Sequence, residues 1–78
     1  AVIDSLGWVH YRLGNLDEAR RLLQQAWDMT GNSEIGAHLG EVMWAQGDRE
    51  GARRIWDASL ASDPGNVMLL KVINRYTP

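Results

Sequence analysis

Three side chains in one short segment could together bind a metal ion. Glu34 lies four residues before His38, and Glu41 lies three residues after it. On a helix, this spacing places two carboxylates and an imidazole on one face. A tight zinc site usually has several His or Cys ligands with supporting hydrogen bonds, whereas this chain has two His and no Cys. The favoured interpretation is a solvated polar groove, with no metal and no other cofactor.

Two pairs of adjacent arginines, Arg20-Arg21 and Arg53-Arg54, could bind phosphate. However, Asp17 precedes the first pair by three and four residues, and Glu50 precedes the second pair in the same way. Acid-base pairs at this spacing support an exposed helix by a few tenths of a kcal/mol each. We therefore expect ion pairs along each helix.

The chain also lacks a nucleophile-base pair, a Gly-rich phosphate loop and a metalloprotease motif, so no enzymatic activity is expected.

The composition narrows the classes of partner. The formal net charge is −2, with eight basic and ten acidic residues, which provides no electrostatic footprint for nucleic acid or an anionic membrane. No apolar run approaches the length of a membrane span, so this segment is not expected to insert into a membrane. The absence of cysteine leaves the compartment open. Because the chain starts with Ala1 and enters a helical pattern at once, we expect it to be a piece of a longer protein.

One pattern occurs twice along the chain, 33 residues apart. The repeated elements are Leu6-Gly7 and Leu39-Gly40, Gly14 and Gly47, and Ala19-Arg20-Arg21 and Ala52-Arg53-Arg54. An internal period of this size indicates a stack of similar units, each of which buries its apolar face against its neighbour. Function is therefore expected on a surface of the stack.

Apolar residues at intervals of three and four predict five helices and no strand. The expected helices run from Ile3 to Leu13, from Asn15 to about Met29, after Ser33 to about Gln46, after Asp48 to just before Asp63, and from Val67 to about Tyr76. The connections are short, so successive helices must be antiparallel neighbours. Small residues at Gly7, Gly40, Ala19, Ala52, Ala26 and Ser59 should let helix backbones approach closely.

The order of small and large residues resembles that of the tetratricopeptide repeat. The second unit carries the family's positions at Leu39-Gly40, Met43, Gly47, Ala52, Trp56, Ser59 and Pro64. The first unit matches at Leu6-Gly7, His10, Gly14, Ala19, Leu23 and Ala26, but it has Gly31 where Pro is usual. The family's Trp position is held by Ile3 and Gly36, which leaves the stacking angle of the two units open. The resemblance implies an all-α solenoid fragment with two antiparallel helix pairs, 1–31 and 32–65, and a capping helix, 66–78.

In that family, the first helix of each pair lines a concave groove that binds a peptide or a helix of a partner protein. The resemblance therefore implies a non-enzymatic interaction module, with partner-binding residues at Asp4, Trp8, Tyr11, Arg12, His38, Glu41 and Trp44. Met68, Lys71, Val72 and Arg75 would continue the groove on the last helix. For the aromatic rings, packing against a neighbouring repeat or helix is the alternative. The acidic groove positions favour a basic or apolar peptide.

Two segments, Leu6–Gly14 and His38–Gly47, further resemble the last repeats of bacterial tetratricopeptide lipoproteins that act as scaffolds in the cell envelope. That resemblance favours the envelope or periplasm over the cytoplasm. An alternative function is a structural end cap or a self-association segment of a longer solenoid. This alternative rests on Met68 and Val72, which the sequence pattern predicts to be under-covered.

Overall fold

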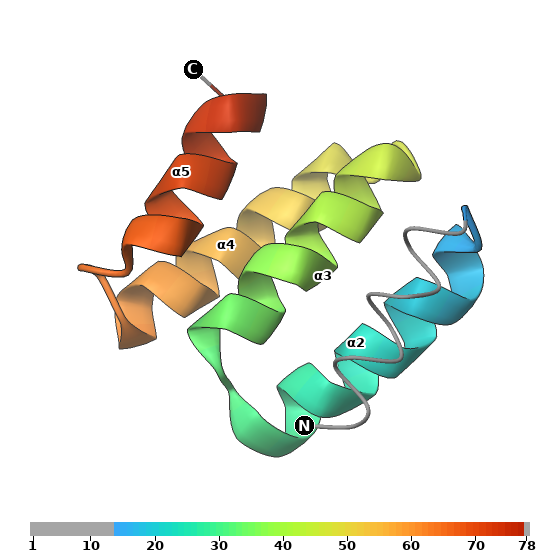
Figure 1. The fold of residues 1–78 in the computed structure, drawn as a ribbon, viewed down its shortest axis with the longest axis horizontal. Helices are drawn as coiled ribbons and strands as arrows, with labels where there is room; N and C mark the ends of the chain where they lie inside the picture. The colour runs from blue at the N-terminus through green and yellow to red at the C-terminus, as the bar shows by residue number, and fades with distance from the viewer. Residues whose placement is uncertain (1–13, 78) are drawn as a thin grey trace.

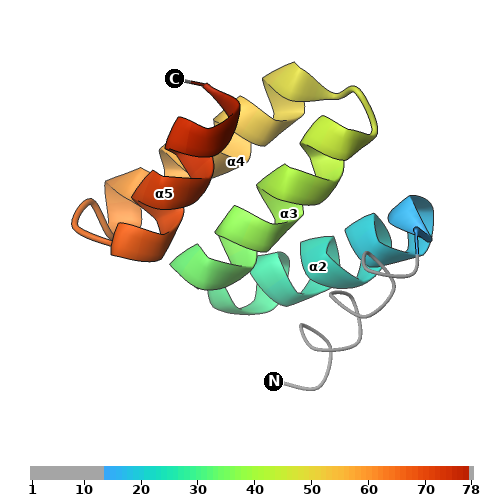
Figure 2. The same ribbon diagram turned by 45° about the horizontal axis from the view of Figure 1, so that its top comes forward.

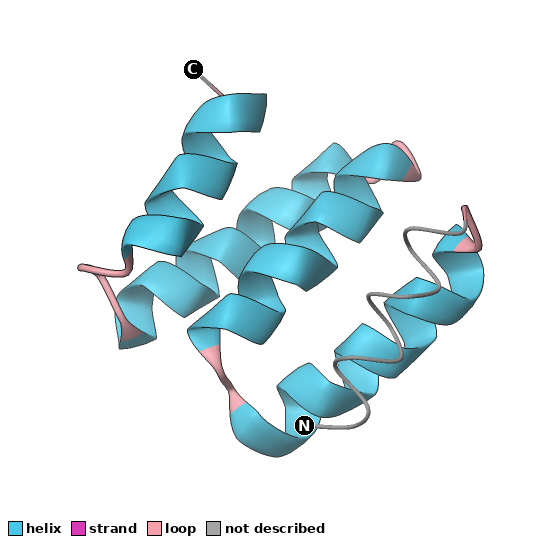
Figure 3. Ribbon diagram, viewed as in Figure 1, coloured by secondary structure: helices cyan, strands magenta, loops and turns pink. Residues whose placement is uncertain are grey.

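The computed structural model describes residues 14–77, which form four α-helices joined by short turns, with no strand in that part of the chain (Figures 1 and 3). The helices are α2 (Leu16–Thr30), α3 (Ser33–Ala45), α4 (Arg49–Ser62) and α5 (Val67–Tyr76). The all-α prediction is confirmed, and these four helices match the expected ones to within about a residue at their ends. The helix expected from Ile3 to Leu13 lies outside the described residues.

The predicted turn residues set the helix boundaries. Gly14 and Gly47 have φ values of 82° and 88°, a left-handed conformation that glycine adopts without steric cost. The side chain of Asn15 accepts a hydrogen bond from the backbone N–H of Glu18, and the side chain of Asp48 accepts one from Gly51. Each repeat therefore uses the same device, a left-handed glycine followed by a polar N-cap, to turn the chain into its second helix.

Helix α3 is the centre of the described fold, because it is the only one of the four helices that contacts the other three. Figures 1 and 2 both show α3 between α2 and α5, with α4 packed along its other side. Among these four helices, α4 also contacts α5, whereas α2 contacts α3 alone. The fully buried side chains that join these layers include Leu23, Leu39, Val42, Trp56 and Leu69.

In the described part of the chain, the small residues of the repeat are buried, and Gly40 makes room for a large side chain of α4. A Cβ atom at Gly40 would lie 2.0 Å from Nε1 of Trp56, and one at Gly36 would lie 2.0 Å from Oγ of Ser59. Trp27 also lies within 2.9 Å of that second position. At Gly40, the large indole of Trp56 fills the space that the missing side chain leaves.

The predicted pairing of Arg20 with Asp17 was also wrong. The guanidinium of Arg20 donates hydrogen bonds to Oε1 of Gln46 at 3.0 Å and to Oδ2 of Asp48 at 2.9 Å. Gln46 in turn donates to Oδ1 of Asp17 at 2.8 Å. The turn at Gly47 carries Gln46 and Asp48 to α2, so the side chain of Arg20 joins the two repeats. Of the adjacent pair Arg20-Arg21, Arg21 is the one that pairs along its own helix, with Glu18.

A second polar junction holds the first turn of α5 against the first turn of α3. The hydroxyl of Ser33 donates to Oδ2 of Asp63 at 2.9 Å, while Nδ2 of Asn66 donates to the same oxygen at 3.0 Å and to the Ser33 oxygen at 3.1 Å. These hydrogen bonds, from Asn66 first and Ser33 second, lower the pKa of Asp63. Asn66 also caps α5 by accepting from the backbone N–H of Leu69. The junction thereby fixes where α5 starts relative to α3.

Candidate functional site

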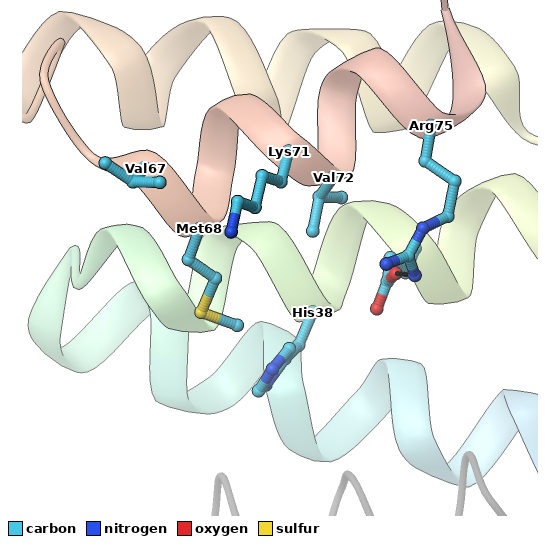
Figure 4. A pocket seen from close by; sticks show the side chains of 7 residues that line it. His38, Val67, Met68, Lys71, Val72 and Arg75 are labelled. Atoms are coloured by element: carbon cyan, nitrogen blue, oxygen red, sulfur yellow. Dashed lines mark hydrogen bonds and ion pairs between the residues drawn. The ribbon is translucent and has the colours of Figure 1, made fainter.

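An open groove of about 520 Å³ lies between α3 and α5. Figure 4 shows this groove, with Met68 and Arg75 reaching from α5 towards α3, from which His38 projects. Its lining residues are His38 and Glu41 on α3, and Val67, Met68, Lys71, Val72 and Arg75 on α5. The lining thus brings together six of the residues expected to form the groove, namely His38, Glu41, Met68, Lys71, Val72 and Arg75.

Helical spacing explains why α5 supplies most of the lining. Positions 67, 68, 71, 72 and 75 recur at intervals of one, three and four residues, which places them on one face of a helix. Val72 is only 6% exposed and belongs to the core, so the expectation that it is under-covered was wrong. Met68 is half-buried against the core, and Val67 is 62% exposed at the mouth of the groove. The groove therefore has an apolar floor and an apolar edge.

Glu41 is an enclosed acid on the α3 side of the groove, with only 5% of its surface exposed. Its Oε1 atom accepts a hydrogen bond from Nη1 of Arg75 at 3.3 Å and one from the hydroxyl of Tyr76 at 3.4 Å. Burial raises the pKa of the Glu41 carboxyl, against the smaller opposing effects of His38, Arg75 and Tyr76. The carboxylate is thus satisfied within the protein and contributes little charge to the groove surface.

The exposed charges of the groove are basic. Lys71 is exposed and makes no hydrogen bond or ion pair with any other residue in the described range. The side chain of Arg75 is 65% exposed even though Nη1 contacts Glu41. A guanidinium has five N–H donors, so the contact with Glu41 leaves most of the Arg75 donors available to solvent or to a ligand.

Trp44 lies outside the groove lining. Its ring stacks on Trp56 with the centroids 5.8 Å apart, and it lies 5.6 Å from the ring of Tyr76 at a tilt of 44°. The guanidinium carbons of Arg49 and Arg53 lie 5.0 and 5.9 Å from the centre of the Trp44 ring. This arrangement agrees with the packing alternative for Trp44. Its role as a partner-binding residue stays a prediction.

Four of the predicted binding residues, Asp4, Trp8, Tyr11 and Arg12, lie outside the described residues. Two residues of the site were missed by sequence reasoning. Val67 follows the cap residue Asn66 directly and precedes Lys71 by four residues, so the helical spacing of α5 could have identified it. The hydroxyl of Tyr76 donates a hydrogen bond to Glu41, which lies 35 residues earlier in the chain. The sequence contains no signal for this contact.

The described residues offer little support for other kinds of site. Between residues 14 and 77, the His, Asp and Glu side chains form no group of three that could hold a metal ion. Within the same range, no helix combines the length and the apolar character that crossing a membrane requires.

Comparison with known proteins agrees with this architecture. The family model described as "Tetratricopeptide repeat" matches residues 10–72. A TPR repeat-containing protein of Pseudomonas aeruginosa is 49% identical over 41 residues, a match that covers 53% of this chain and 7% of that protein. The chain thus corresponds to a small part of this relative. Since the family model covers most of the sequence, and the described helices have the expected order and turns, the chain belongs to the tetratricopeptide repeat family.

Proposed function

We propose that this chain binds a segment of a partner protein in the groove between α3 and α5. Tetratricopeptide repeats generally mediate protein-protein interaction, which supports a binding role over a catalytic one. The observation that carries the proposal is the groove itself, an open space of about 520 Å³ with an apolar floor, an apolar edge at Val67, and the exposed cations Lys71 and Arg75. Such a surface suits a short extended or helical segment, whose apolar side chains would meet Met68 and Val67.

The groove is also well suited to binding because its walls are fixed before a partner arrives. The hydrogen bonds among Ser33, Asp63 and Asn66 hold the two helices together at one end. The contacts of Glu41 with Arg75 and Tyr76 hold them together further along α5. A preformed groove loses less conformational entropy on binding, and this improves affinity.

The proposal can be tested without knowing the natural partner. Random linear peptides displayed on phage would be selected against the immobilised chain, and the dissociation constants of the enriched peptides would be measured. We expect at least one family of peptides whose affinity falls about tenfold or more in Val67→Asp and Met68→Asp, because both substitutions place a charge where an apolar side chain docks.

The chain offers a matched control in Met29→Asp. Met29 is 70% exposed on α2 and does not line the groove, so this substitution adds the same charge elsewhere. Val67 is largely exposed, so Val67→Asp should retain the fold even if Met68→Asp does not, and circular dichroism melting would verify both. Selection that yields no peptides sensitive to these groove variants would contradict the proposal.

Self-association is a second candidate function, supported by a specific observation on α5. Leu70 is 40% exposed, and a hollow of about 180 Å³ between α4 and α5 includes Leu60 and Ile73 in its lining. A second copy of the chain could cover these apolar side chains. Sedimentation velocity should then show a dimer that dissociates in Leu70→Glu, whereas a monomer across the concentration range would exclude this function.

A further inference from the structure

We infer that two copies of this chain pair through the outer faces of α4 and α5, with Arg53 of each copy bound to Asp57 of the other. This inference rests on self-association, the second candidate function, because it names the contacts that join the two copies. It concerns the hollow of about 180 Å³ between α4 and α5, which shares no lining residue with the groove between α3 and α5.

The hollow combines apolar surface with two charges of opposite sign. Leu60 and Ile73 in its lining are half-buried against the core, and Leu70, three residues before Ile73, is 40% exposed. The α4 side of the lining recurs at intervals of three and four residues, which places it on one face of the helix. Its members are Arg53, Trp56, Asp57 and Leu60.

The two charges of this face do not satisfy each other within one copy. Arg53 and Asp57 are both exposed and lie four residues apart, yet neither forms a hydrogen bond or an ion pair with any residue between 14 and 77. The guanidinium carbon of Arg53 lies 5.9 Å from the centre of the Trp44 ring. This ring contact leaves the N–H donors of Arg53 without an acceptor among the described residues, so they can bind a carboxylate of a second molecule.

A two-fold axis converts this arrangement into two ion pairs. In a symmetric dimer, every contact between two different residues occurs twice, once in each direction. If two α4 helices cross in antiparallel fashion at the level of Ile55, which lies midway between Arg53 and Asp57, each arginine faces the aspartate of the other copy. A parallel crossing would instead bring like charges together, so the charges also select the orientation.

Charge complementarity favours a second copy over an unrelated partner, because the same face supplies both members of each pair. The antiparallel arrangement also covers the apolar side chains of Leu60, Ile73 and Leu70, which lie beside the charges on the two helices. Since exposed ion pairs are individually weak and the apolar area is small, we expect a reversible dimer whose population rises with concentration.

Charge reversal tests the pairing. Sedimentation velocity over a range of concentrations would be measured for the wild type, Arg53→Glu and Asp57→Arg. Each substitution places like charges at both contacts, so each should raise the dissociation constant of the dimer about tenfold or more. Both side chains are exposed, so the variants should keep the fold, which circular dichroism melting would verify.

The sharpest arm of the test mixes the two variants. In the mixed dimer, the acid introduced at position 53 of one chain faces the arginine introduced at position 57 of the other, and the native Asp57 faces the native Arg53. Both contacts are again attractive, so the mixture should dimerise with about the wild-type affinity, and so should the double variant Arg53→Glu/Asp57→Arg. Lys71→Glu is the control, because it changes the charge as Arg53→Glu does but lies outside the hollow.

The outcomes separate this inference from self-association itself. A dimer that dissociates in Leu70→Glu but is unaffected by Arg53→Glu and Asp57→Arg would overturn the reciprocal pairing and leave self-association intact. Loss of the dimer in both single variants without recovery in the mixture, or an equal loss in Lys71→Glu, would also overturn the pairing. A wild-type chain that stays monomeric at every concentration would remove both, and would mean that a different molecule covers the hollow.

Discussion

The indole of Trp56 occupies the space where a side chain of Gly40 would begin. A Cβ atom at Gly40 would lie 2.0 Å from Nε1 and 2.4 Å from Cε2 of that ring. The ring is only 1% exposed, and its Nε1 donates a hydrogen bond to the carbonyl of Ala37 at 3.4 Å. The packing of α4 on α3 therefore depends on the absence of a side chain at residue 40.

The substitution Gly40→Ala should destabilise the fold, although alanine favours helices over glycine by up to about 1 kcal/mol. The added methyl group must displace a buried ring, and overpacking of this kind costs about 1–3 kcal/mol. Gly65→Ala is the control, because a Cβ atom at Gly65 would meet no atom within 4 Å. Urea denaturation should show a net loss of about 1–2 kcal/mol for Gly40→Ala and little change for Gly65→Ala. Equal effects would show that the contact with Trp56 is unimportant.

Arg20→Ala should destabilise the chain more than Arg21→Ala. Arg20 joins α2 to the turn after α3 through Gln46 and Asp48, whereas Arg21 pairs with Glu18 on the exposed face of α2. Both Arg20 and Asp48 are about one-third exposed, so solvent screening limits the cost of losing Arg20 to about 1 kcal/mol. The loss for Arg21→Ala should be smaller, because its ion pair with Glu18 is exposed to solvent. Thermal melting of both variants, at matched ionic strength, would reveal whether this order holds.

Glu41 should make stability depend on pH in a defined direction. Because burial raises the pKa of Glu41 in the folded state, the folded chain holds this proton more tightly than the unfolded chain. The contribution of Glu41 to stability is therefore greatest below its ordinary pKa of about 4.3 and declines as pH rises through the raised pKa. The free energy of unfolding of the wild type, minus that of Glu41→Gln, should fall between acidic and neutral pH.

Chemical denaturation at several pH values would measure this difference. Glu34→Gln is a suitable control, because Glu34 is an exposed carboxylate on the same helix. A wild-type advantage over Glu41→Gln that grows as pH rises would mean that the contact with Arg75 outweighs burial, in contradiction to the raised pKa.

Trp44→Ala should lower stability by about 2 kcal/mol, because the ring of Trp44 stacks on Trp56 and contacts Tyr76. Trp44→Phe should recover much of this loss by retaining an aromatic ring. Thermal melting gives the stability of each variant, and titration with the peptides selected on the groove gives the affinity. Unchanged melting with lost affinity would instead identify Trp44 as a binding residue.

Much of the fold could be predicted from local sequence. The pairs Gly14-Asn15 and Gly47-Asp48 predicted two helix starts, and Asn66 predicted a third. These signals are reliable because a left-handed glycine and a polar N-cap act within a few residues of the chain. The groove on α5 could also be predicted, since the helical period alone brings Met68, Lys71 and Arg75 onto one face.

Contacts between distant residues could not be predicted in the same way. The sequence placed Asp17 at ion-pair distance from Arg20, but the partner in the structure is Asp48, which is 28 residues away. It also presented Glu41 as an exposed groove acid, although α5 covers it and supplies Arg75 and Tyr76 as partners. In each case the actual partner lies far along the chain, and the packing of the helices brings it into contact.

The sequence by itself thus determined the helices, their turns and the repeat family, because these depend on interactions within about one helical turn and on a period that is visible in the chain. The tertiary structure alone decided which charges remain exposed. Burial between α3 and α5 encloses the carboxylate of Glu41 and leaves Lys71 and Arg75 at the surface. The electrostatic character of the groove follows from that difference in solvent access. The order of charged residues along the sequence does not predict which of them will be buried.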